Sequence, residues 1–208
     1  MQNLFEEACD HLSKDKIMSF LVKQFKNKIN WGNRYNPNHA VSISNLIIEQ
    51  QISFKAAITV KKRFSELING MSNEQILKIN LDKLQSIGIS YKKAEYIKNV
   101  FNFFNTTNHN FKHMSDAQVI KLLSTIKGVG EWTAQMFLIF SLFRENIFSP
   151  KDLALINSIK KNYGIDKIEN EMLNELVSRW SPYNSIACLF LWESIENKIF
   201  YSPKVEKF

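Results

Sequence analysis

The stretch IKGVGEWTAQM, residues 126–136, decides the fold class of this chain. It places Gly128 and Gly130 one residue apart, directly before an acidic residue and a helix-like run. Glycine costs backbone entropy and the chain has only six, so this pair indicates a turn that needs them. Gly128 can take the positive φ that ends a helix, and Gly130 can leave backbone amides exposed at the start of the next helix. The stretch predicts a helical hairpin that suits a phosphate, with an ordinary corner between helices as the alternative.

The rest of the chain is patterned for helices almost throughout. Six Gly and four Pro in 208 residues leave few breaks, and the alternation typical of strands is scarce. The predicted helices span residues 3–10, 14–25, 40–49, 54–64, 73–79, 81–86, 91–105, 116–125, 131–143, 150–163, 169–180 and 184–194. The longest stretches without helical periodicity, 30–39 and 106–114, are predicted to be surface loops. We therefore expect an all-α fold.

A weak internal repeat involves the same hairpin. The segment LQSIGISYKKAEYI, residues 84–97, aligns with LSTIKGVGEWTAQMF, residues 123–137, with one residue inserted. Gly88 then falls on Gly128, and Ser90 falls on Gly130. Each copy has the pattern helix, tight turn, helix. The repeat predicts two helical hairpins packed side by side, of which the second is better formed.

Composition narrows the classes of protein that the chain can belong to. Its formal net charge of +7 favours polyanions such as nucleic acid or an anionic membrane, although it also serves solubility. The two cysteines, Cys9 and Cys188, exclude a four-cysteine zinc or iron–sulfur site. The N-terminus lacks the apolar core of a signal peptide, and no run of 18 apolar residues exists. We expect an intracellular protein without a membrane partner.

A second informative segment is FSPKDLALINSIKKNYG, residues 148–164. Ser149 is a good N-cap, Pro150 fits the first helical position, and Asp152 completes an S-x-x-D capping box. Asp152 can therefore be a simple cap. A carboxylate at a helix N-terminus is also favoured in its charged form, and it is then suited to facing a developing cation.

Together these segments resemble one DNA glycosylase superfamily. The Gly-Val-Gly hairpin, the Trp-Thr-Ala helix and the Pro-x-Asp-Leu helix start are similar to the helix–hairpin–helix, loop and aspartate of the HhH-GPD glycosylases. The similarity is greatest to the 3-methyladenine DNA glycosylase II (AlkA-type) branch. LIIEQQISFKAA (46–57) and RWSPYNSIACLFLW (179–192) also match it. The resemblance covers about residues 41–192 and is more specific in its combined order and spacing than in any single motif.

The resemblance implies a role for each matched position. The hairpin would grip a DNA phosphate through the amides of Gly128, Val129 and Gly130. Asp152 would be the catalytic aspartate, stabilising positive charge on the deoxyribose and orienting water. A monovalent cation, Na⁺ or K⁺, would sit on the backbone carbonyls of Ser124, Ile126 and Val129. No other cofactor is expected, and no iron–sulfur cluster.

The resemblance also implies a base pocket and a wedge. Strand-nicking members carry a lysine where this chain has Trp132, so we expect an enzyme that stops at the abasic site. Trp132 would stack on the damaged base with Trp192, although Trp192 can equally be a core residue. Met136 stands where relatives carry a tyrosine, which makes the pocket less aromatic. In the EQQIS turn, Gln50, Gln51 and Ile52 would contact DNA, and Gln51 would fill the gap left by the flipped base. The alternative is that the glutamines only brace the turn.

The expected protein is an all-α, two-lobed helical HhH-GPD glycosylase with a cleft between its lobes. One lobe spans about residues 41–143, and the other combines residues 1–40 with 144–208. The extra N-terminal β-rich domain of larger relatives is not expected. The expected partner is damaged double-stranded DNA, bound by a monomer in the bacterial cytoplasm (at the nucleoid) or the eukaryotic nucleus. The resemblance implies excision of alkylated purines of the 3-methyladenine type. A catalytically silent DNA-binding module, or a glycosylase for oxidised guanine or uracil, remains the alternative.

Overall fold

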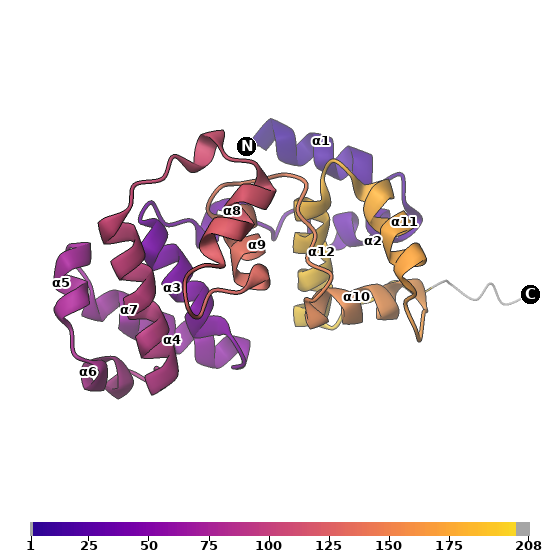
Figure 1. Cartoon of the computed structure of the whole chain (residues 1–208). Coiled ribbons are helices and arrows are strands. Elements are labelled where there is room, and N and C mark those ends of the chain that lie inside the picture. The colour runs from indigo at the N-terminus through magenta and orange to yellow at the C-terminus, as the bar shows by residue number, and fades with distance from the viewer. Residues whose placement is uncertain (1, 203–208) are drawn as a thin grey trace, which may run out of the picture. The chain divides into compact units, whose positions relative to one another are not determined.

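The chain is divided into two compact units. A computed structural model describes residues 2–202, without the side chain of Phe54. Of the described residues, those before 34 and those from 144 onward form unit 1, and residues 34–143 form unit 2. Within the described range the regular structure consists of twelve α-helices and two short 3-10 helices, with no strand (Figure 1). The predicted all-α class is confirmed.

Unit 2 is built on three helices that bury apolar faces against each other. Helix α3 packs against α7 and α9, and α4, α5, α6 and α8 pack around them (Figure 1). Every residue of α9 from Thr133 to Phe140 is buried, which makes this helix the centre of the core. The bounds are α3 His39–Glu49, α4 Phe54–Leu67, α5 Asn73–Lys78, α6 Leu81–Ser86, α7 Tyr91–Thr106, η2 Phe111–His113, α8 Asp116–Leu123 and α9 Glu131–Phe140.

Unit 1 surrounds one buried helix. Helix α12 contacts α1, α2, α10 and α11 (Figure 1), and its stretch from Asn184 to Leu191 is buried throughout. Full burial of a side chain such as Phe190 contributes about 1.5–3 kcal/mol of hydrophobic stabilisation. The bounds are α1 Gln2–Leu12, α2 Lys16–Phe25, α10 Leu153–Tyr163, α11 Asn170–Trp180 and α12 Asn184–Asn197, with η1 at Trp31–Arg34.

The structure corrects the prediction at a few positions. Helix α9 ends at Phe140 rather than at residue 143, and Phe143 has a φ of 52°, which is incompatible with a continuing α-helix. The two predicted surface loops each contain a 3-10 turn that carries a buried aromatic residue, Trp31 with 5% exposed and Phe111 with 3% exposed. These loops are therefore anchored to the cores and are not wholly superficial.

His39 provides a test of the core of unit 2. Its ring lies among aromatic rings, with centroids 5.3 Å from Phe111 and 5.2 Å from Phe137. Burial lowers the pKa of His39 below its ordinary value of 6.5. The unfolded chain then binds a proton that the folded chain does not, so stability falls as the pH drops below about 6.5. We expect the melting temperature to fall between about pH 7 and pH 5, and to fall less in His39→Phe. If the melting temperatures of the two proteins fell by the same amount over this pH range, the prediction would be contradicted.

Neither a membrane-spanning helix nor a metal-binding cluster is found among residues 2–202. None of the described helices combines the length and apolarity that crossing a membrane requires. In the same part of the chain, no three His, Cys, Asp or Glu side chains gather in a way that could hold a metal ion.

Candidate functional site

The hairpin between α8 and α9 lies in unit 2 and has the predicted geometry. Gly128 has a φ of +104°, and the Val129 amide donates to the Ile126 carbonyl at 2.9 Å. Val129 is 5% exposed and anchors the turn in the core, whereas Gly130 is exposed. The glycine conformation is fixed by packing as well, because a Cβ on Gly128 would lie 2.1 Å from Cγ of Tyr96.

The start of α9 differs from every other helix start in unit 2. Its N-cap is Gly130, which offers no side chain to the first-turn amides. The other six α-helices of this unit each begin with a side-chain cap, from Asn38, Ser53, Ser72, Asn80, Ser90 or Ser115. A helix N-terminus that no side chain closes is suited to an anion. Among the α-helices of unit 2 the start of α9 is thus the one best suited to an anion, and its contact with a DNA phosphate stays a prediction.

The first hairpin repeats the geometry without this opening. Gly88 has a φ of +99°, close to that of Gly128, as the sequence repeat predicts. At the position of Gly130, however, stands Ser90, whose hydroxyl accepts from the Lys93 amide at 3.4 Å. The first hairpin therefore caps its own helix α7 and leaves no comparable opening.

The turn between α3 and α4, Gln50–Ser53, separates the roles of the two glutamines. The side-chain Nε2 of Gln50 donates to Oγ1 of Thr133 at 3.0 Å and lies 3.5 Å from the Gly128 carbonyl oxygen. Gln50 thus braces the turn against the hairpin. Gln51 is exposed, in the left-handed conformation with φ 56°, and Ile52 is 40% exposed. Gln51 and Ile52 are placed to meet a ligand, and their DNA contacts stay predictions.

Two of the proposed pocket residues lie on α9. Trp132 is partly exposed in the first turn of the helix, directly after the hairpin. Met136, one turn later, is only 1% exposed and belongs to the core of unit 2. Trp132 is thus the more accessible of the two, and the pocket role of both stays a prediction.

Asp152 lies in unit 1, at the start of α10, where the structure corrects the predicted cap. The helix begins at Leu153, and Asp152 itself is the N-cap rather than Ser149. Its Oδ1 accepts from the amides of Ala154 at 2.9 Å and Leu155 at 3.0 Å. The Ser149 carbonyl accepts from the Asp152 amide at 3.1 Å, so residues 149–152 form a turn ahead of the helix. The carboxylate is 7% exposed and fixed in orientation.

Helix α12 brings Cys188 close to Asp152 within unit 1. Burial raises the pKa of the Cys188 thiol, and the nearby charge of Asp152 raises it further. The thiol therefore stays neutral beside the carboxylate. Trp192 follows one helical turn after Cys188, on the same helix, and is partly exposed. Sequence patterns did not indicate Cys188 as a neighbour of Asp152, because only the packing of α10 on α12 brings them together.

Two basic residues of α4 and α7, Lys61 and Lys93, bind groups of the protein itself. Lys61 pairs with Glu49, and Lys93 donates to backbone carbonyls at the end of α3. The exposed basic side chains on α4 and α7 are those of Lys55, Lys62, Arg63 and Lys92. These four are the ones available for phosphate contacts.

The carbonyls proposed for a monovalent cation lie around the hairpin. The Ile126 oxygen already accepts from the Val129 amide, and a carbonyl has a second lone pair. Neutral oxygens in a tight turn fit a monovalent ion, so the residues present are compatible with the predicted site.

The described residues form a helical fold with a helix–hairpin–helix whose second helix starts without a side-chain cap, which is typical of a protein that binds phosphate groups. Residues 45–182 match the HhH-GPD superfamily of base excision DNA repair proteins, so the chain belongs to that family. DNA-3-methyladenine glycosylase 1 of Schizosaccharomyces pombe is 26% identical over 214 residues, covering 95% of this chain and 94% of its own length.

Two solved structures agree with this assignment. The 3-methyladenine DNA glycosylase Mag1 of S. pombe, in complex with abasic DNA, has a TM-score of 0.82 and 25% identity, covering 91% of this chain and 97% of its own. A DNA-3-methyladenine glycosidase of Bacillus halodurans has a TM-score of 0.66 and 28% identity, covering 90% and 94%.

Proposed function

We propose that this protein is a monofunctional DNA glycosylase of base excision repair that removes alkylated purines of the 3-methyladenine type from duplex DNA. The observation that carries the proposal is Asp152, a nearly buried carboxylate fixed at a helix start in a chain of the HhH-GPD family. The relatives named as 3-methyladenine glycosylases support the choice of substrate.

The chemistry proposed for Asp152 is electrostatic. As the N-glycosidic bond breaks, the base takes the bonding electrons and positive charge develops on the deoxyribose. The Asp152 carboxylate stabilises that charge more strongly than a solvated group would, because it is shielded from bulk water. Water then adds to the sugar carbon, guided by the carboxylate, and gives up a proton. A methylated purine such as 3-methyladenine is already cationic, so it leaves without prior protonation.

The hairpin and the turn are proposed to hold the DNA while the base is flipped out. The amides at Gly128, Val129 and Gly130 bind one phosphate, and a monovalent cation on the hairpin carbonyls reinforces that turn. Gln51 fills the gap in the duplex, and Trp132 stacks on the extruded base. The protein acts as a monomer on damaged double-stranded DNA.

Trp132 is the basis for proposing that the enzyme does not nick the strand. An indole cannot form the Schiff base that a lysine at this position forms. We expect methylated duplex DNA treated with the protein to gain abasic sites while its strands stay intact until alkali is added. Borohydride should trap no covalent protein–DNA adduct. A trapped adduct together with nicked strands would overturn the monofunctional assignment.

A catalytically silent DNA-binding module is the second candidate, because the uncapped start of α9 is suited to a phosphate whether or not a carboxylate acts on the base. The two candidates differ at Asp152, which only the enzyme needs. Duplex binding without the release of any base from methylated, oxidised or uracil-containing DNA would establish the silent module.

A further inference from the structure

The turn Gln50–Ser53 has a backbone that needs external support. Gln51 has a φ of 56°, in the left-handed region that side chains other than glycine rarely adopt. Such a conformation persists only where the surroundings impose it. The contacts that impose it come from the end of α3 and from α7.

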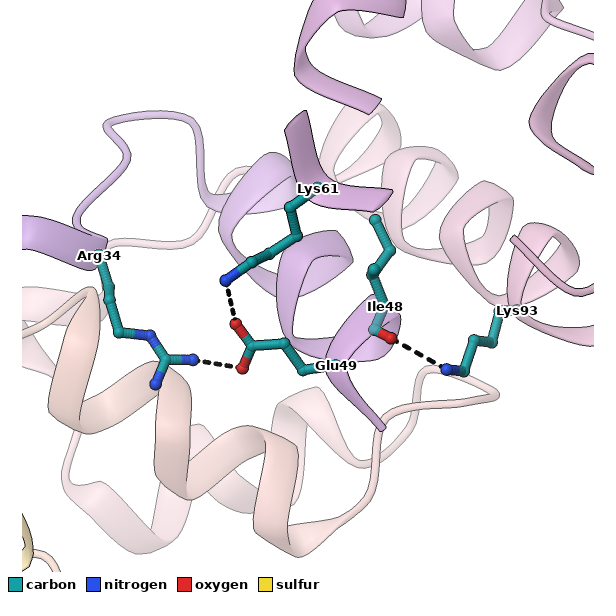
Figure 2. Close-up of polar contacts among 5 residues, drawn as sticks. All are labelled: Arg34, Ile48, Glu49, Lys61 and Lys93. Carbon is teal, nitrogen blue, oxygen red and sulfur yellow. Dashed lines mark hydrogen bonds and ion pairs between the residues drawn. The ribbon is translucent and has the colours of Figure 1, made fainter. Parts of the chain in front are cut away.

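Lys93 on α7 holds the last carbonyls of α3. Its Nζ donates to the Ile48 carbonyl at 2.9 Å and also to the Gln50 carbonyl (Figure 2 shows the bond to Ile48). A helix C-terminus leaves such carbonyls without intrahelical partners, and a cation there is favoured by the helix dipole. Burial lowers the pKa of the half-buried Lys93 ammonium, as expected for a group directed into the protein.

A second set of contacts fixes the same helix end from the other side. Glu49, the last residue of α3, pairs with both Arg34 and Lys61 (Figure 2). The guanidinium carbon of Arg34 also lies 4.0 Å from the ring centroid of Phe140 on α9. The end of α3 is thus tied to α4, α7 and α9, and little freedom remains for the residues that follow it.

The turn is also coupled to the phosphate-binding hairpin. The Gln50 side chain donates to Oγ1 of Thr133, while the Gln50 carbonyl accepts from Lys93. One residue therefore links the second hairpin with the helix of the first. A shift of the turn would change the position of Gln51 relative to the hairpin.

We propose that Lys93 is a positioning residue: it holds the turn Gln50–Ser53 at a fixed place relative to the hairpin, so that Gln51 and Ile52 can enter the duplex. The proposal rests on the proposed function and adds a residue that acts through the turn rather than on the DNA. It predicts that loss of the Lys93 ammonium impairs base flipping and leaves general DNA binding intact.

The matched comparison is Lys93→Met against Lys92→Met. Both variants remove one positive charge, but Lys92 is exposed and its Nζ lies over the Tyr96 ring, 5.9 Å from the centroid, rather than on the end of α3. Flipping is followed with a duplex that carries fluorescent 2-aminopurine beside a stable abasic analogue. We expect Lys93→Met to reduce the fluorescence rise and to lower kcat for base release by about 10- to 100-fold. The Kd of Lys93→Met for undamaged duplex should stay close to the wild-type value, because the Lys93 ammonium is bonded to backbone carbonyls of the protein and is not available to phosphate.

A readout on the protein alone separates this proposal from the proposed function. Hydrogen exchange of the amides of residues 50–53 should be faster in Lys93→Met than in the wild type and unchanged in Lys92→Met. Lys93→Gln, which keeps a donor, is measured in parallel and should be intermediate; it serves as the comparison if Lys93→Met does not fold. Equal exchange and equal fluorescence in the Lys92 and Lys93 variants would overturn the positioning role. If the wild type released no base while exchange at residues 50–53 was still faster in Lys93→Met than in Lys92→Met, only the proposed function would be refuted.

Discussion

Asp152→Asn is expected to abolish base release and to leave both the fold and DNA binding intact. Loss of a group that stabilises transition-state charge costs about 10²- to 10³-fold in rate. The fold is spared because Asn and Asp are equally good N-caps, and the amide oxygen of Asn can still accept from Ala154 and Leu155. Single-turnover release from methylated duplex DNA, together with a binding titration, measures both effects.

The chain contains a matched control for this substitution. Asp15 caps α2 in the same way, accepting from the amides of Ile17 at 2.8 Å and Met18 at 3.0 Å. Asp15→Asn makes the same chemical change at another helix start in unit 1, and its pairing with Arg179 at 3.7 Å is weak. It should release base at the wild-type rate. If Asp152→Asn retained full activity, or if both variants lost it equally, Asp152 would not be the catalytic carboxylate.

Gly128→Ala is expected to destabilise the protein more than an alanine at Gly130 or Gly164, and to weaken DNA binding. The new Cβ would lie 2.1–2.5 Å from Tyr96 atoms, on a backbone with φ +104°. Strain in the left-handed region and overpacking together cost about 2–4 kcal/mol, which lowers the melting temperature by roughly 5–15 °C. A displaced hairpin also loses an amide bond to phosphate, worth about 1.5–3 kcal/mol, so duplex affinity falls by about tenfold or more.

Two other glycines separate the causes of this effect. Gly164 has a φ of +65° with no atom within 4 Å of an added Cβ, so Gly164→Ala carries strain without a clash. Gly130 has a φ of −97° and equally open surroundings, so Gly130→Ala should leave the melting temperature nearly unchanged. If Gly128→Ala had the same melting temperature as Gly130→Ala, the packing of the hairpin on Tyr96 would not be important for stability.

Most of the helices could be predicted because local signals mark them. Ser72 and Ser115 form capping boxes with glutamines three residues later, and Gly164 ends α10 in the left-handed conformation. Gly128 was predictable as well, although α8 ends at Leu123 and the positive φ lies in the turn before α9, where it favours glycine. The cap of α10 was misplaced because Ser149 and Asp152 are both good caps, and the turn that precedes Asp152 carries no distinct signal.

The parts of the site that depend on tertiary packing were not predictable. Lys93 reads as a surface lysine on α7, and only the packing of α7 on α3 directs its ammonium to the Ile48 carbonyl. The role of Gln50 likewise depends on Thr133, which is 83 residues later in the chain. The packing of α9 also buries Met136, which is 1% exposed, and its pocket role stays a prediction.

The most direct test of the proposed function is to incubate the protein with methylated duplex DNA and identify the released bases by mass. We predict free 3-methyladenine, one abasic site for each base released, and unbroken strands. Absence of any methylated base from the supernatant, or release of oxidised guanine or uracil from DNA that carries those lesions instead, would contradict the assignment.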